Sequence, residues 1–137
     1  MKEKFTILIA DRNRNIREFL QREMTAEGYH VYLAKNGCEV LKIIDFVHPD
    51  ILVLDPDIPY LDGLEILDQL QHENMSIPVF LHAFYKENED YTGIHKVTAF
   101  VEKNGNSVNQ LKALIADTLK KHYPRRFSRI YSMMSIK

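Results

Sequence analysis

The chain has 137 residues, of which 45% are hydrophobic and 27% charged, and its formal net charge at pH 7 is −1. This length suits one domain with an ordinary core, and the near-neutral charge argues against nucleic-acid binding driven by electrostatics. A single cysteine, Cys38, excludes an internal disulfide or a cysteine metal cluster. Because residues 1–5 lack the apolar segment of a signal peptide and no run is long enough to span a membrane, we expect a cytoplasmic protein with no membrane contact.

Apolar runs and helical spacings alternate along the chain. Short apolar or alternating runs bounded by turn residues predict strands at residues 5–10, 29–34, 51–54, 78–82 and 98–102. Apolar residues three and four apart predict helices at residues 13–27, about 40–47, 64–72, 86–96 and 107–122. This alternation predicts an α/β fold with a doubly wound, five-stranded parallel sheet flanked by five helices.

The C-terminal segment follows a proline. Pro124 ends the last predicted helix, and residues 123–137 are basic and partly aromatic but too short for an output domain. We expect a domain at residues 1–122 followed by a frayed tail at 123–137. The alternative is that the tail docks on a partner or packs back on the fold.

Polar side chains follow four of the predicted strands. They are Asp11 with Arg12 after the first strand, Asp55 after the third, His82 with Ala83 after the fourth and Lys103 after the fifth. Right-handed crossovers bring these strand ends to one edge of the sheet, where open α/β folds place their ligands. We therefore expect a small anionic or metal-assisted site there. A simple turn role for Asp55 is the alternative.

The order and spacing of several short motifs resemble the receiver domain of two-component response regulators, from about residue 5 to residue 122. The matching motifs lie at residues 7–11, 28–31, 49–50, 54–55, 58–59, 62–63, 77–80 and 99–103. The resemblance implies a flavodoxin-like fold. It also implies a signalling module, not an enzyme, whose conserved aspartate accepts a phosphoryl group from a histidine kinase or phosphotransfer protein.

The residues of such a site carry over in part. Asp55 matches the phosphoacceptor, Lys103 the lysine that contacts the phosphoryl group, and Asp11 the first of two acids that bind Mg²⁺. Asp57 matches the position whose backbone carbonyl binds the metal. Arg12 stands where the resemblance implies the second acid.

Arg12 changes the expected chemistry of the site. Mg²⁺ relies on carboxylate oxygens. Two unit charges about 4 Å apart interact by roughly 4 kcal/mol at an effective dielectric constant of 20, so a guanidinium at that distance opposes binding of the ion. Mg²⁺ binding at Asp11, Asp55 and the Asp57 carbonyl should therefore be weak or absent. We expect Arg12 and Lys103 to neutralise the three acids in place of a metal. The alternative is that Arg12 extends freely into solvent.

Ala83 stands where the resemblance implies a threonine or serine that contacts the phosphoryl oxygens. Phe100 occupies the aromatic position that turns inward behind that hydroxyl. Because Ala83 has no donor, the conformational switch should be weakened or follow another route. Shifting the alignment by one residue would put His82 at this position, but the spacing from Pro78 favours Ala83.

Three functional readings follow. The first is a stand-alone response regulator that is phosphorylated on Asp55 and signals by contact with a downstream protein. Receivers often form homodimers, so the resemblance also implies a possible homodimer. The second is a degenerate receiver that binds partners without phosphorylation. The third is a small phosphatase that uses Asp55 and Asp57. Phosphatases of the haloacid-dehalogenase type carry such an aspartate pair after the first strand of a longer chain, whereas here the pair follows the third strand, so the third hypothesis is the weakest. Asp55 and Lys103 favour the first hypothesis, whereas Arg12 and Ala83 favour the second. We expect a receiver in phosphorelay signalling, and the sequence leaves open whether Asp55 is phosphorylated.

Overall fold

The protein is described by a computed structural model that covers residues 4–84 and 97–135. Its five strands are β1 (Thr6–Ala10), β2 (His30–Ala34), β3 (Ile51–Leu54), β4 (Val79–Ala83) and β5 (Ala99–Glu102). The helices of the described residues are α1 (Arg14–Ala26), α2 (Gly37–Val47), α3 (Gly63–His72), α4 (Ser107–His122) and α5 (Pro124–Ser135). The predicted helix at 86–96 lies outside the described residues.

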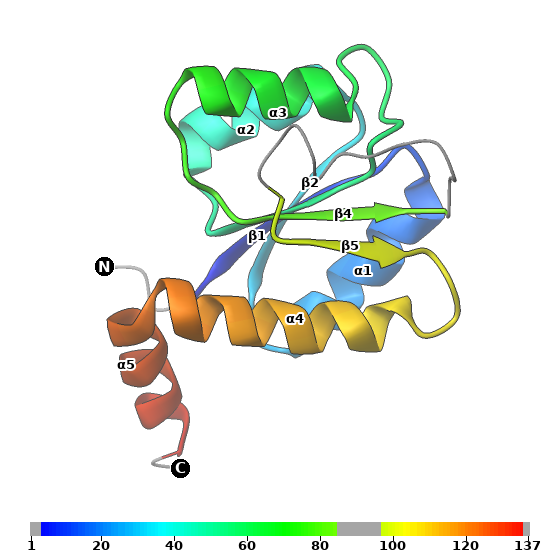
Figure 1. Ribbon diagram of the computed structural model, residues 1–137. Helices are drawn as coiled ribbons and strands as arrows, with labels where there is room; N and C mark the ends of the chain where they lie inside the picture. The colour runs from blue at the N-terminus through cyan, green and yellow to red at the C-terminus, as the bar shows by residue number, and fades with distance from the viewer. Residues whose placement is uncertain (1–3, 85–96, 136–137) are drawn as a thin grey trace.

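The strands form one parallel sheet in the order β2-β1-β3-β4-β5. Figure 1 shows α2 and α3 on one face of the sheet and α1 and α4 on the other. Because helices cover both faces of the sheet, β3 is a continuous apolar run, β1 is apolar after Thr6, and both strands are wholly buried. The predicted doubly wound parallel sheet is confirmed.

Side-chain caps fix where three helices begin. Asn13 and Asn36 accept hydrogen bonds from backbone N–H groups in the first turns of α1 and α2. Asp62 and Glu65 form a reciprocal capping box at the start of α3. The caps start α1 and α2 soon after β1 and β2 end, so these two loops are short, whereas residues 55–62 form a longer loop between β3 and α3.

The C-terminal segment is a helix, so the expected frayed tail at 123–137 is wrong for residues 124–135. Helix α5 begins at Pro124, whose fixed φ suits the first helical position. It lies at the amino-terminal edge of the sheet, opposite the strand ends that follow the arrowheads in Figure 1. Ile130 is buried in the core cluster of β1, α1 and α4, with Phe127 and Tyr131 packed beside it. The helix packs back on the fold because this apolar stripe would otherwise be left in water.

An ion pair attaches α5 to the strand that carries Asp55. The Arg126 guanidinium donates to both carboxylate oxygens of buried Asp50, at 2.7 and 3.1 Å, directly before β3. It also lies over the rings of Phe5 and Tyr123, 4.6 and 5.3 Å from their centroids. Bidentate, partly buried pairs of this kind are among the stronger charged interactions.

We expect Arg126→Ala to lower the free energy of unfolding by about 2–3 kcal/mol, because it leaves the Asp50 carboxylate buried without its charged donor. Urea unfolding measures the loss. The matched control is Arg125→Ala, at an exposed position one residue earlier, which should stay near wild type. Equal effects at both arginines would show that the pair with Asp50 contributes nothing.

Within residues 4–84 and 97–135, no helix is long and apolar enough to cross a bilayer.

Candidate functional site

The carboxyl edge of the sheet brings four of the predicted residues together. Asp11 and Arg12 follow β1, Asp55 follows β3 and Lys103 follows β5. The sheet hydrogen bonding continues into this edge, since the Asp55 N–H donates to the Ala10 carbonyl at 2.8 Å. Asp11 and Asp55 are each 1% exposed, so the parallel sheet holds two carboxylates in its interior.

Lys103 is the buried cation of the site. Its Nζ lies 2.9 Å from Asp11 Oδ2 and 3.6 Å from Asp55 Oδ2, and its side chain is 5% exposed. Burial raises the pKa of Asp11, and the hydrogen bond from Lys103 acts in the opposite direction. Two carboxylates packed against one ammonium leave an excess of negative charge that needs a second cation.

Arg12 lies on the outer side of the same carboxylates. Its Nε is 3.4 Å from Asp55 Oδ2 and its Nη2 is 3.7 Å from Asp57 Oδ2. The Arg12 side chain is 46% exposed, whereas the Asp55 side chain is 1% exposed. The guanidinium therefore lies over the opening to Asp55 and does not extend freely into solvent.

Backbone groups also hold the Asp55 carboxylate. Its Oδ1 accepts from the Asp57 N–H at 3.0 Å and its Oδ2 accepts from the Arg12 N–H at 3.3 Å. Both carboxylate oxygens thus have fixed donors, which preorganises the orientation of the group. The predicted cluster of Asp11, Asp55 and Asp57 with Arg12 and Lys103 is brought together by these contacts.

The loop after Asp55 is closely packed on α3. The Gly63 N–H donates to the Pro56 carbonyl at 2.8 Å, and a Cβ added at Gly63 would lie 2.7 Å from Pro56 Cα. A side chain at this position would push Pro56 and the adjoining Asp55 out of place. The Asp62-Gly63 motif therefore fixes the position of the phosphoacceptor candidate.

The fourth strand ends at Ala83, beside Lys103. The Lys103 N–H donates to the Ala83 carbonyl at 2.7 Å, and Ala83 offers no side-chain donor. His82 is not at this opening: it is 3% exposed, and its Nε2 lies 3.1 Å from Ser107 Oγ at the start of α4. The sequence did not identify this pair, because alternation within a wholly buried strand does not reveal the partner of each side chain.

We expect His82 to make the fold less stable as the pH falls from about 6.5 towards 4. Burial, with Lys103 adding to it and Asp55 opposing it, lowers the pKa of His82 from 6.5 to about 4. In this pH range the imidazole of the unfolded chain binds a proton, whereas that of the folded chain stays neutral. The free energy of unfolding is therefore lower by roughly 3 kcal/mol at pH 4 than at neutral pH. Urea unfolding as a function of pH measures the effect.

The control for this pH dependence is His82→Gln, which keeps a hydrogen-bonding group but does not titrate. Its stability should fall less steeply with acid than that of wild type, while His30→Gln, at an exposed histidine, should follow the wild-type curve. Equal pH slopes in wild type and His82→Gln would contradict the expectation.

The donor set does not fit the Mg²⁺ site that the resemblance implies. Mg²⁺ needs near-octahedral oxygen ligands, and no group of three histidine, cysteine or acidic residues in the described ranges could hold a metal ion. Asp11 is paired with Lys103, and Asp55 with Lys103 and Arg12. The side-chain cations that lie against these acids among the described residues are Lys103 and Arg12.

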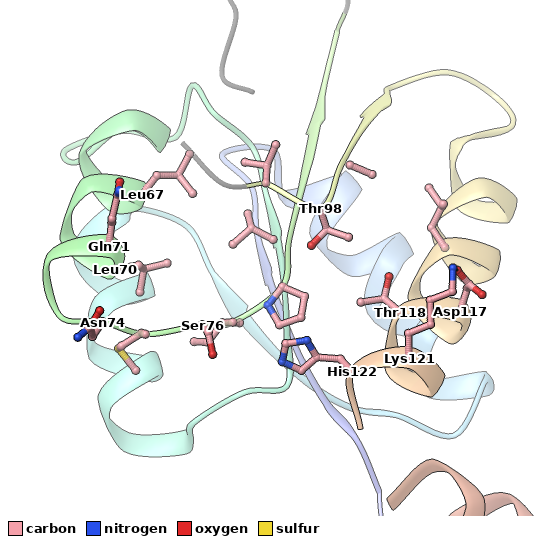
Figure 2. A pocket seen from close by; sticks show the side chains of 17 residues that line it. Leu67, Leu70, Gln71, Asn74, Ser76, Thr98, Asp117, Thr118, Lys121 and His122 are labelled. Atoms are coloured by element: carbon pink, nitrogen blue, oxygen red, sulfur yellow. The ribbon is translucent and has the colours of Figure 1, made fainter. Parts of the chain in front are cut away.

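A groove among the described residues lies away from this site. It lies between α3 and α4 at the amino ends of β4 and β5, shown in Figure 2 with Leu70, Asn74 and Thr118 among its lining residues. None of the site residues described above lines it. Val97, which also lines it, adjoins the undescribed residues 85–96, so we assign the groove no role.

Comparison with known proteins identifies a family with this arrangement of strands. The family profile of the response regulator receiver domain matches residues 7–116. The response regulator MprA of Mycobacterium ulcerans is 43% identical over 75 residues, which are 55% of this chain and 32% of MprA. MprA of Mycobacterium avium is 43% identical over the same share of this chain and 33% of its own length. The chain thus spans about a third of the length of these curated relatives.

Solved receiver structures have the same fold. Response regulator TrrA of Thermotoga maritima, solved with Mg²⁺ and BeF, has a TM-score of 0.74 and 29% identity over 82% of this chain and 97% of its own. Chemotaxis protein CheY4 of Vibrio cholerae has a TM-score of 0.73 and 21% identity over 82% and 97%. With a profile that matches most of its length and five parallel strands in the receiver arrangement, this chain belongs to the response regulator receiver family of two-component signalling.

Proposed function

We propose that this receiver accepts a phosphoryl group on Asp55 with Arg12 in the place of a divalent cation, and that it signals as a stand-alone cytoplasmic module by protein contact. The observation that carries the proposal is the position of two cations against one Asp55 oxygen, Arg12 Nε at 3.4 Å and Lys103 Nζ at 3.6 Å. Phosphoryl transfer depends mainly on positioning and on neutralising charge at the phosphoryl oxygens, and arginine side chains are known to supply that charge.

The chemical step is a substitution at phosphorus. An Asp55 carboxylate oxygen forms a bond to the phosphorus of a phosphohistidine or of acetyl phosphate. The bond from phosphorus to the leaving group breaks, and the leaving group keeps its electron pair. Arg12 and Lys103 then neutralise the oxygens of the new acyl phosphate. Arg12 is half exposed and has room to move outward as the group enters.

The histidine kinase or phosphotransfer protein would approach Asp55 at this edge, past Arg12. A downstream protein would contact the surface of β5 and α4, where Phe100 is 41% exposed. This surface lies beside Lys103, so a change at Asp55 has a short path to it.

The test is intact-mass analysis after incubation with acetyl phosphate, beside an Asp55→Asn control. We expect one phosphoryl group on the wild-type protein and none on the control. A folded wild-type protein that gains no mass would overturn the proposal.

The second candidate is a receiver that binds partners without phosphorylation. One observation favours it: Ala83 ends β4 at the opening of the site with no hydroxyl to follow a phosphoryl group. A partner that binds wild type and Asp55→Asn equally well, and ignores acetyl phosphate, would support this candidate.

A further inference from the structure

A buried polar pair lies behind the site, on the side of the sheet covered by α4. His82 and Ser107 are 3% and 7% exposed, and His82 Nε2 and Ser107 Oγ are 3.1 Å apart. The other ring nitrogen, Nδ1, is buried and has no hydrogen-bond partner among the described residues. Burying a ring nitrogen without a hydrogen-bond partner costs folding free energy. This cost favours a role for His82 beyond filling space in the core.

The pair closes the loop that carries Lys103. This loop runs from Lys103 to Ser107, and both of its ends are attached to the last two residues of β4. At one end the Lys103 N–H donates to the Ala83 carbonyl at 2.7 Å. At the other end Ser107 Oγ is bonded to the His82 ring. Adjacent residues of one strand therefore hold the two ends of one loop.

The middle of the loop has little other support from the fold. Residues 104–106 are exposed, and a Cβ placed on Gly105 would meet nothing within 4 Å. Asn106, which precedes α4, makes no side-chain cap to the helix. The hydrogen bonds that Asn104 makes stay within the loop, to the N–H groups of Asn106 and Ser107.

We propose that His82 is a positioning residue for Lys103: its bond to Ser107 fixes the start of α4 and, through the loop, holds the Lys103 ammonium against Asp11 and Asp55. The inference rests on the proposed function, because the positioning matters most when Lys103 meets a phosphoryl group. Displacing such a group by about 1 Å slows reactions by up to about a hundredfold.

The first test is the rate of Asp55 phosphorylation by acetyl phosphate. His82→Ala and Ser107→Ala should each be about 10- to 100-fold slower than wild type. His82→Gln, which keeps an amide near the Nε2 position, and Ser107→Thr, which keeps the hydroxyl, should recover most of the rate. Thr118→Ala, a hydroxyl removed further along α4, is the control and should match wild type. Wild-type rates in both alanine variants would overturn the inference.

The second test needs no phosphorylation, so it separates this inference from the proposed function. A double-mutant cycle combines Ser107→Ala, or His82→Ala if Ser107→Ala does not fold, with Lys103→Met, and reads the unfolding equilibrium constant in urea. Positioning predicts that the two changes are coupled by at least about threefold. A purely local role for the pair predicts that the two effects multiply independently, which would overturn the inference even if wild type is phosphorylated. If wild type gains no phosphoryl group but the coupling is present, the proposed function fails and the positioning role stands.

Discussion

An Arg12→Asp variant is expected to bind Mg²⁺ at least about a hundredfold more tightly than the wild-type protein. Arg12 lies 3.4 Å from Asp55 and 3.7 Å from Asp57, on the open side of the two carboxylates. A unit positive charge at about 4 Å opposes a bound divalent cation by roughly 8 kcal/mol at an effective dielectric constant of 20. The substitution removes this opposition and adds a carboxylate ligand beside Asp11. Calorimetric titration with Mg²⁺ measures the change.

Two control variants separate ligand geometry from overall charge. Arg14→Asp makes the same charge change two residues later, at a side chain that is 80% exposed and paired with Glu18, and should leave Mg²⁺ affinity near the wild-type value. Arg12→Asn removes the guanidinium without adding a carboxylate and should give an intermediate affinity. If Arg12→Asp and wild type bind Mg²⁺ with equal affinity, Arg12 is not the residue that weakens Mg²⁺ binding at this site.

Lys103→Met should lower the free energy of unfolding at neutral pH by about 3–5 kcal/mol. Removing one partner of a buried ion pair leaves the other charge buried without compensation, and here Asp11 and Asp55 both lose their ammonium neighbour. Methionine keeps the length of the side chain, so the loss is electrostatic more than steric. Urea unfolding measures it, with Lys121→Met as the control at an exposed pair with Asp117.

The sign of the pH dependence gives this variant a second test. Burial raises the folded-state pKa of Asp11, so the folded chain keeps a proton that the unfolded chain has released, and stability falls as the pH rises through that range. Lys103 limits this fall because its hydrogen bond and charge lower the same pKa. The deficit of Lys103→Met should therefore shrink as the pH falls from neutral towards the carboxylate range. A deficit that is constant with pH would show that Asp11 is not the group left unpaired.

The fold could be predicted from local patterns because each pattern matches its environment. Strand β3 is apolar throughout and β1 is apolar after Thr6 because helices cover both faces of the sheet, and the sequence displays this pattern. Asn13 and Asp62 are residue types that favour helix N-caps, and their side chains accept hydrogen bonds from the first turns of α1 and α3. Helix α5 was missed because its basic residues resemble a solvated tail. The spacing of Phe127, Ile130 and Tyr131 after Pro124 was the available signal.

The site could be predicted in its composition but not in all its contacts. Topology alone brings the strand ends together, so Asp11, Asp55 and Lys103 were foreseeable as neighbours. Whether Arg12 would turn towards Asp55 or towards water is a choice of rotamer that the sequence does not encode. The bond between His82 and Ser107 joins residues 25 positions apart and depends on how α4 packs on β4. Neither residue belongs to a motif with a fixed spacing, so the sequence contains no pattern that predicts this contact.

The most direct measurement is the rate at which acetyl phosphate phosphorylates the wild-type protein, followed by intact mass, in EDTA and in millimolar Mg²⁺. With Arg12 and Lys103 already neutralising Asp55, we expect the two wild-type rates to agree within about twofold, whereas Arg12→Asp should react only when Mg²⁺ is present. A wild-type rate that requires Mg²⁺ would contradict the replacement of the metal by Arg12.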